Sequence, residues 1–148
     1  MDYFSAMKAA TINELKQELL NEKPAKLVEL CIRLARFKKE NKELLTYLLF
    51  EAHDTEAYIK SVIQEMDSNF ETINKSNAYF VKKTLRKILR ITHKFIRYSG
   101  SDIVATELLI HFCKTVKKMD KSITTNQVII NIYQNQLKKI NKAIAAMH

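Results

Sequence analysis

Apolar residues recur at three- and four-residue intervals along nearly the whole chain, and no stretch of useful length alternates between apolar and polar positions. The first pattern is typical of amphipathic helices, whereas strands require the second. Polar breaks divide the chain into about seven helices with short connections, which favours antiparallel neighbours. We therefore predict an all-α fold of antiparallel helical hairpins. Two arrangements are open: a short irregular α-α superhelical stack, or a compact helical bundle.

Several helix starts are marked by side chains that can accept hydrogen bonds from the free amides of the first turn. Thr11 and Glu14 have the spacing of a capping box, and Thr124 and Gln127 repeat that spacing near the end of the chain. Asp54 is a suitable N-cap. These signals predict helix starts after residues 11, 54 and 124.

The segment over residues 41–53 has little polar circumference if it is helical. Its apolar members are Leu44, Leu45, Tyr47, Leu48, Leu49, Phe50 and Ala52. A helix that is apolar nearly all round is usually buried on several sides. The pattern therefore predicts that this helix is the centre of the core.

The chain has 148 residues and a mass of 17.3 kDa, which is the size of one ordinary domain. We predict a single all-helical domain over residues 1–148, in which residues 1–10 form a loosely ordered N-terminal segment. Only one glycine, Gly100, and one proline, Pro24, are present. Phosphate-cradling loops, dinucleotide fingerprints and nucleophile elbows all need glycine at sharp turns, so the sequence excludes these motifs.

Charge is distributed unevenly along the chain. Residues 1–71 hold ten Lys and Arg against thirteen Asp and Glu, whereas residues 72–148 hold fifteen against three. Such asymmetry is an argument about partners. It indicates an anionic partner for the C-terminal half.

The predicted helix over residues 77–98 carries most of this positive charge, and no acidic residue lies between Glu71 and Asp102. At 100° per residue its cations and His93 occupy an arc of about 140°, opposite an apolar side. We call seven of these cations the basic face: Lys82, Lys83, Arg86, Lys87, Arg90, Lys94 and Arg97. One interpretation is a solvated face covered by acids of the first half. The other is a surface that binds an anionic partner.

The partner class follows from which other side chains accompany the cations. Few amides accompany the arginines, so contacts to phosphates are favoured over the reading of base edges. Tyr79 lies near the basic face and could stack on a base, whereas Phe80 and Tyr98 are expected in the core. The leading hypothesis is a non-catalytic module that binds an acidic or anionic macromolecule, with a protein as the first partner. The alternative is a DNA- or RNA-binding protein with mainly phosphate contacts.

The C-terminal helix shows a second pattern, in which apolar residues alternate at three- and four-residue steps. This seam consists of Ile130, Tyr133, Leu137, Ile140, Ile144 and Met147. A narrow seam suits one partner helix. An intramolecular partner is favoured, and a homodimer through this helix is the alternative.

The residues for catalysis or metal binding are sparse, and we predict neither enzymatic activity nor a metal or other cofactor. His111 and Cys113 point about 200° apart on one helix and cannot chelate the same ion. A nucleophilic pair of Cys113 and His93 is a remote alternative. With two cysteines, no signal peptide and no apolar run long enough to span a bilayer, we expect a cytoplasmic protein without integral membrane contact.

Overall fold

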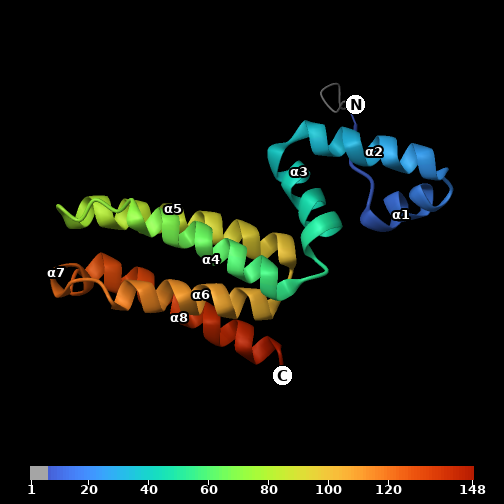
Figure 1. The fold of residues 1–148 in the computed structure, drawn as a ribbon. Helices are drawn as coiled ribbons and strands as arrows, with labels where there is room; N and C mark the ends of the chain where they lie inside the picture. The colour runs from blue at the N-terminus through green and yellow to red at the C-terminus, as the bar shows by residue number, and fades with distance from the viewer. Residues whose placement is uncertain (1–6) are drawn as a thin grey trace, which may run out of the picture. The chain divides into compact units, whose positions relative to one another are not determined.

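Every element of the described chain is a helix, and the all-α prediction is confirmed. The structure is a computed structural model that describes residues 7–148. Its α-helices are α1 (Ile12–Leu20), α2 (Pro24–Phe37), α3 (Lys39–Thr46), α4 (Thr55–Glu71), α5 (Ala78–Ser99), α6 (Asp102–Lys117), α7 (Lys121–Thr124) and α8 (Gln127–Ala146), and a π-helical segment, η1 (Tyr47–Glu51), follows α3 (Figure 1).

The chain forms two compact units, Met1–Leu45 and Thr46–His148, and each is described by itself. We call them unit 1 and unit 2. The single domain over residues 1–148 stays a prediction. Of the predicted loose segment, residues 1–6 lie outside the described chain, and residues 7–10 precede α1 without regular structure and are exposed.

Unit 1 consists of amphipathic helices, and the capping box predicted at the start of the first of them is present. The Glu14 amide donates to Thr11 Oγ1 at 3.2 Å, and Glu14 Oε1 accepts from the Thr11 amide at 3.4 Å, so the capping box is present. Pro24 occupies the first turn of α2. None of the residues in α1, α2 or α3 is buried. The apolar stripes of α1 and α2 are therefore largely exposed within the structure.

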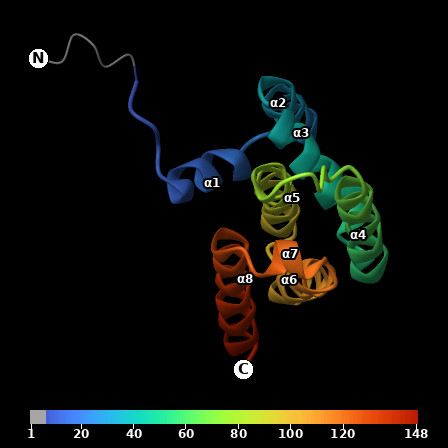
Figure 2. The same ribbon diagram turned by 90° about the vertical axis from the view of Figure 1, so that its left-hand side faces the viewer.

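Unit 2 is built from four long helices that alternate in direction. Figure 1 shows α4 and α5 as one hairpin layered on α6 and α8. Seen along the helices, α4 and α8 lie on opposite sides of the α5–α6 pair (Figure 2). Helix α6 packs against α4, α5 and α8, and its contact with α8 is the most extensive between elements of the described residues. Unit 2 thus has the antiparallel hairpins that the short connections predict.

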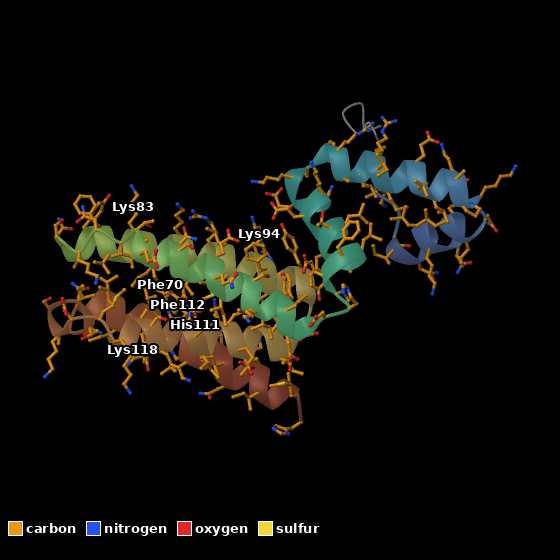
Figure 3. All side chains as sticks on the ribbon, viewed as in Figure 1. Phe70, Lys83, Lys94, His111, Phe112 and Lys118 are labelled. Atoms are coloured by element: carbon orange, nitrogen blue, oxygen red, sulfur yellow. The ribbon has the colours of Figure 1, made fainter. Side chains whose placement is uncertain are left out.

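The core lies between these helices. Phe112 of α6 is fully buried, and its ring centroid is 5.7 Å from that of Phe70 on α4; both lie between the two layers (Figure 3). The Tyr58 hydroxyl donates to the Phe95 carbonyl oxygen at 2.7 Å and connects α4 to α5. All buried residues of the described chain lie between Tyr58 and Ala143. The core therefore belongs to unit 2.

The prediction that residues 41–53 form the centre of the core is wrong. Helix α3 ends at Thr46, and the chain continues as η1. Only Tyr47 of η1 packs against the core, with its ring centroid 4.7 Å from that of Tyr58, whereas Leu48, Leu49 and Phe50 are exposed. The physical reason is that the described contacts of η1 within unit 2 are mainly with α4 and α5, which bury Tyr47 and leave Leu48, Leu49 and Phe50 facing solvent.

The predicted start of the last helix after Thr124 is also wrong. Thr124 belongs to the short helix α7, and Asn126 is the N-cap of α8. The side-chain oxygen of Asn126 accepts hydrogen bonds from the amides of Val128 at 3.0 Å and Ile129 at 3.4 Å. Asparagine is among the best N-cap residues, and it satisfies two free amides here without a capping box.

Candidate functional site

Helix α5 carries the basic face and is defined at both ends by its own sequence. The Asn77 side chain accepts a hydrogen bond from the Phe80 amide at 3.1 Å and caps the first turn. At the other end Gly100 adopts a left-handed conformation with φ 58°, and its amide donates to the Ile96 carbonyl oxygen at 3.0 Å. The 22 residues of α5 span about 33 Å at 1.5 Å per residue.

The two sides of α5 lie in different surroundings. Val81, Leu85, Ile88, Leu89 and Thr92 are buried in the core of unit 2. Five members of the basic face are exposed, namely Lys83, Arg86, Lys87, Arg90 and Arg97, while Lys82 and Lys94 are half-buried. Figure 3 shows Lys83 and Lys94 on the side of α5 away from Phe70 and Phe112. Helix α5 therefore presents a row of cations along one side.

Carboxylates of unit 2 do not compensate the exposed cations. The Asp67 carboxylate of α4 lies 2.6 Å from His111 Nε2 of α6, and neither residue belongs to the basic face. Neither Arg86 nor Arg90 has an acidic partner in unit 2. Two cations instead lie over aromatic rings: Lys82 Nζ is 5.4 Å from the Tyr79 ring centroid, and Lys94 Nζ is 5.7 Å from that of Phe95.

A hollow of about 400 Å³ adjoins the N-terminal half of the basic face. It is lined by Thr72, Asn74, Phe80, Lys83, Thr84, Lys87 and Arg90. Three of these side chains are cations, three offer hydroxyl or amide groups, and none is a carboxylate. The lining is therefore suited to an anion that also accepts hydrogen bonds.

Sequence reasoning identified Lys83, Lys87 and Arg90 of this hollow but not Thr72, Asn74 or Thr84. Thr72 and Asn74 belong to the connection from α4 to α5, and only the return of the chain brings them beside α5. The expectation that Phe80 lies in the core is wrong, because its side chain is 39% exposed and lines the hollow. Tyr98 is half-buried.

His93 joins α5 to α8 on the border of the basic face. Its Nε2 atom lies 3.2 Å from Gln136 Oε1 and 3.3 Å from Lys139 Nζ. Burial lowers the pKa of His93 below its ordinary value of 6.5, the charge of Lys139 lowers it further, the hydrogen bond with Gln136 raises it, and Arg97 lowers it. The neutral imidazole is therefore favoured, and the positive charge of this surface comes from its lysines and arginines.

The apolar seam predicted on the C-terminal helix is divided by the structure. Only Ile140 of the seam is buried; Ile130 and Tyr133 are half-buried, and Leu137, Ile144 and Met147 are exposed. The buried stripe of α8 is instead Ile129, Ile132, Gln136, Ile140 and Ala143. Ile130, Tyr133 and Leu137 line a second hollow of about 450 Å³ with residues of α6. A homodimer through this helix stays a prediction.

The buried thiol of Cys113 is poorly suited to act as a nucleophile. Burial raises the pKa of the Cys113 thiol to about 11, so its nucleophilic thiolate is scarce at neutral pH, and the Sγ atom lies 4.0 Å from the Tyr133 carbonyl oxygen. Over residues 7–148, no three His, Cys, Asp or Glu side chains come together as metal ligands do. Helices that combine the length and apolarity needed to cross a bilayer are absent from the same residues.

Comparisons of the chain with known protein families, with curated proteins and with solved structures found no match.

Proposed function

We propose that this protein is a non-catalytic interaction module that binds an anionic macromolecule through the basic face of α5. One observation carries the proposal: exposed cations extend along one side of a well-capped helix, and no carboxylate of unit 2 pairs with Arg86 or Arg90. Like charges three and four residues apart repel one another. A bound polyanion relieves that repulsion and releases its own counterions, so affinity depends steeply on salt.

The test is a titration of the full chain with three fluorescently labelled polyanions: a single-stranded oligonucleotide, a DNA duplex and a polyglutamate peptide. We expect at least one to bind with micromolar affinity at low salt. If about five phosphates of a single strand are contacted, raising salt from roughly 50 to 200 mM weakens binding on the order of 100-fold. Arg86→Glu with Arg90→Glu is expected to abolish that binding.

A matched control separates the basic face from net charge alone. Lys114→Glu with Lys118→Glu changes the net charge by the same amount. Both lysines are exposed and have the same four-residue spacing, with Lys114 on α6 and Lys118 at its C-cap. Lys118 lies on the side of unit 2 away from Lys83 (Figure 3). We expect this control to bind nearly as well as the natural chain. Equal loss in both variants, or no binding of any probe at low salt, would refute the proposal.

We also propose a cytoplasmic location, supported by the two cysteines, which are both free thiols, with Cys31 exposed. Exposed free thiols persist in reducing compartments and are oxidised elsewhere. Alkylation of protein taken directly from its native cells is expected to modify Cys31 without prior reduction. Labelling that requires a reductant would contradict a reducing compartment.

A further inference from the structure

The N-terminal end of the basic face carries two exposed aromatic rings. Tyr79 is 57% exposed and Phe80 is 39% exposed. Their ring centroids lie 5.5 Å apart in an edge-to-face arrangement, and Lys82 lies over the Tyr79 ring. The core of unit 2 gains little from these rings, because so much of their surface faces solvent. They leave π surface available beside a row of cations.

These rings adjoin the cationic hollow. Phe80 is part of its wall, and Lys83, Lys87 and Arg90 follow along the same helix. Lys83 lies about 6 Å along the axis from Tyr79, Lys87 another 6 Å on, and Arg90 about 4.5 Å beyond it. Aromatic surface and cations thus succeed one another along one line, with the hydroxyls of Thr72 and Thr84 and the amide of Asn74 beside the cations.

This combination distinguishes among anionic partners. An acidic peptide without aromatic residues, like an anionic lipid surface, contacts the cations but offers no aromatic plane to stack on Tyr79. A DNA duplex offers phosphates, but its bases are already stacked on one another. A single strand offers both phosphates and free base planes, and proteins bind single strands through cationic grooves with exposed aromatic side chains.

We propose that this end of α5 is a binding site for single-stranded nucleic acid, in which Tyr79 stacks on a base while Lys83, Lys87 and Arg90 contact successive phosphates. The inference rests on the proposed function, since it uses the basic face, and it adds the class of partner. The Asn74 amide and the Thr84 hydroxyl donate to phosphate or sugar oxygens in the hollow, whereas the Thr72 hydroxyl already donates to the Asn69 carbonyl oxygen. Affinity is therefore largely independent of base sequence and sensitive to salt.

The test is fluorescence anisotropy of the full chain with oligouridylate and oligothymidylate of about 12 nucleotides, a length within usual single-strand site sizes. A duplex of equal length and a polyglutamate peptide complete the set of probes. We expect both single strands to bind more tightly than the duplex at equal salt. A difference between the uridylate and the thymidylate identifies RNA or DNA as the preferred strand.

Substitution of the exposed ring separates stacking from charge. Tyr79→Ala is expected to weaken single-strand binding about 5- to 150-fold, the range for loss of one base–aromatic stack, and to leave duplex binding unchanged. Tyr79→Phe keeps the π surface and is expected to bind as the natural chain does. Phe50→Ala removes an aromatic ring that is 66% exposed outside the hollow and is expected to change nothing. Lys87→Gln is expected to reduce the salt slope by about one unit.

The outcomes separate this inference from the proposed function. If the duplex or polyglutamate binds as tightly as the single strands, or if Tyr79→Ala binds unchanged, the single-strand site is refuted while salt-dependent binding through Arg86 and Arg90 still stands. If no probe binds at low salt, both proposals fail. Circular dichroism of Tyr79→Ala verifies folding, which the exposure of this side chain is expected to preserve.

Discussion

The Nε2 atom of His93 lies 3.2 Å from the Oε1 atom of Gln136, and this contact connects the helix of the basic face to α8. Gln136 is one of two buried polar residues among those described, and its amide nitrogen also donates to the Ile132 carbonyl oxygen at 3.4 Å. A buried amide is tolerated where its groups are paired. His93 therefore supplies part of the reason that glutamine occupies an otherwise apolar stripe.

Acidification is expected to destabilise unit 2 through His93. Burial, with the charges of Lys139 and Arg97, lowers the pKa of His93 in the folded chain, against the effect of Gln136. The unfolded chain, with an ordinary histidine pKa of about 6.5, therefore takes up the proton first as the pH falls. Well above pH 6.5 His93 is neutral in both the folded and the unfolded chain, and this destabilisation is absent. Below pH 6.5 the free energy of unfolding declines. Urea denaturation at a series of pH values measures this decline.

His93→Gln removes the titrating group, so its stability should depend less steeply on pH below about 6.5. The control is His53→Gln, because His53 is exposed near the start of α4. This control should retain the pH dependence of the natural chain. Equal pH dependence in His93→Gln and the natural chain would rule out the assignment to His93.

Substitution of Gly100 should cost stability through the backbone alone. Its φ of 58° is in the left-handed region, and an added Cβ would meet no atom within 4 Å. Gly100→Ala is therefore expected to lower the free energy of unfolding by about 1 kcal/mol. Gly100→Asn should cost less, because asparagine tolerates this conformation better. Chemical denaturation of both variants checks the order, and an alanine variant as stable as the natural chain would contradict it.

Truncation of Phe112 should lower the free energy of unfolding more than any of the other substitutions. Its side chain is fully buried against Phe70, between α4 and α6. Phe112→Ala removes apolar burial and leaves a cavity, at a cost of about 3–5 kcal/mol. Phe50→Ala, at an exposed position, is expected to stay within about 0.5 kcal/mol of the natural chain. Comparable losses in the two variants, measured by thermal or urea unfolding, would place the core elsewhere.

The start of α8 can be tested by comparing two caps. Asn126 accepts from two amides of the first turn, so Asn126→Ala is expected to lower the free energy of unfolding by about 1 kcal/mol. Thr124 lies in α7 and does not cap α8, so Thr124→Ala is expected to cost less. Urea denaturation measures the free energy of unfolding of both variants. A larger decrease for Thr124→Ala would support the capping box of Thr124 with Gln127 instead.

The sequence predicted helix starts well where the capping groups lie within a few residues of one another. The capping box of Thr11 and Glu14 and the N-cap at Asp54 are both present, because each depends on atoms within a few residues of one another. The same reasoning failed at Thr124, where two overlapping signals competed and the sequence spacing did not indicate that Asn126 would accept the bonds.

Burial was predicted less well, because it depends on neighbours that are distant in sequence. An apolar circumference predicted burial for Leu48, Leu49 and Phe50, which are exposed, and an apolar border predicted burial for Phe80, which lines the hollow. The same limit applies to α8, where the seam through Tyr133 and Leu137 differs from the stripe that packs against the other helices.

The sequence by itself determined the helical class and the separation of cations from apolar residues on α5, since both follow from the 3.6-residue period of a helix. Only the tertiary structure decided which apolar stripes find a partner. It also placed Thr72 and Asn74 beside Lys83, because the return of the chain between α4 and α5 forms the hollow. Contacts between residues of separate elements depend on packing, which no local periodicity encodes.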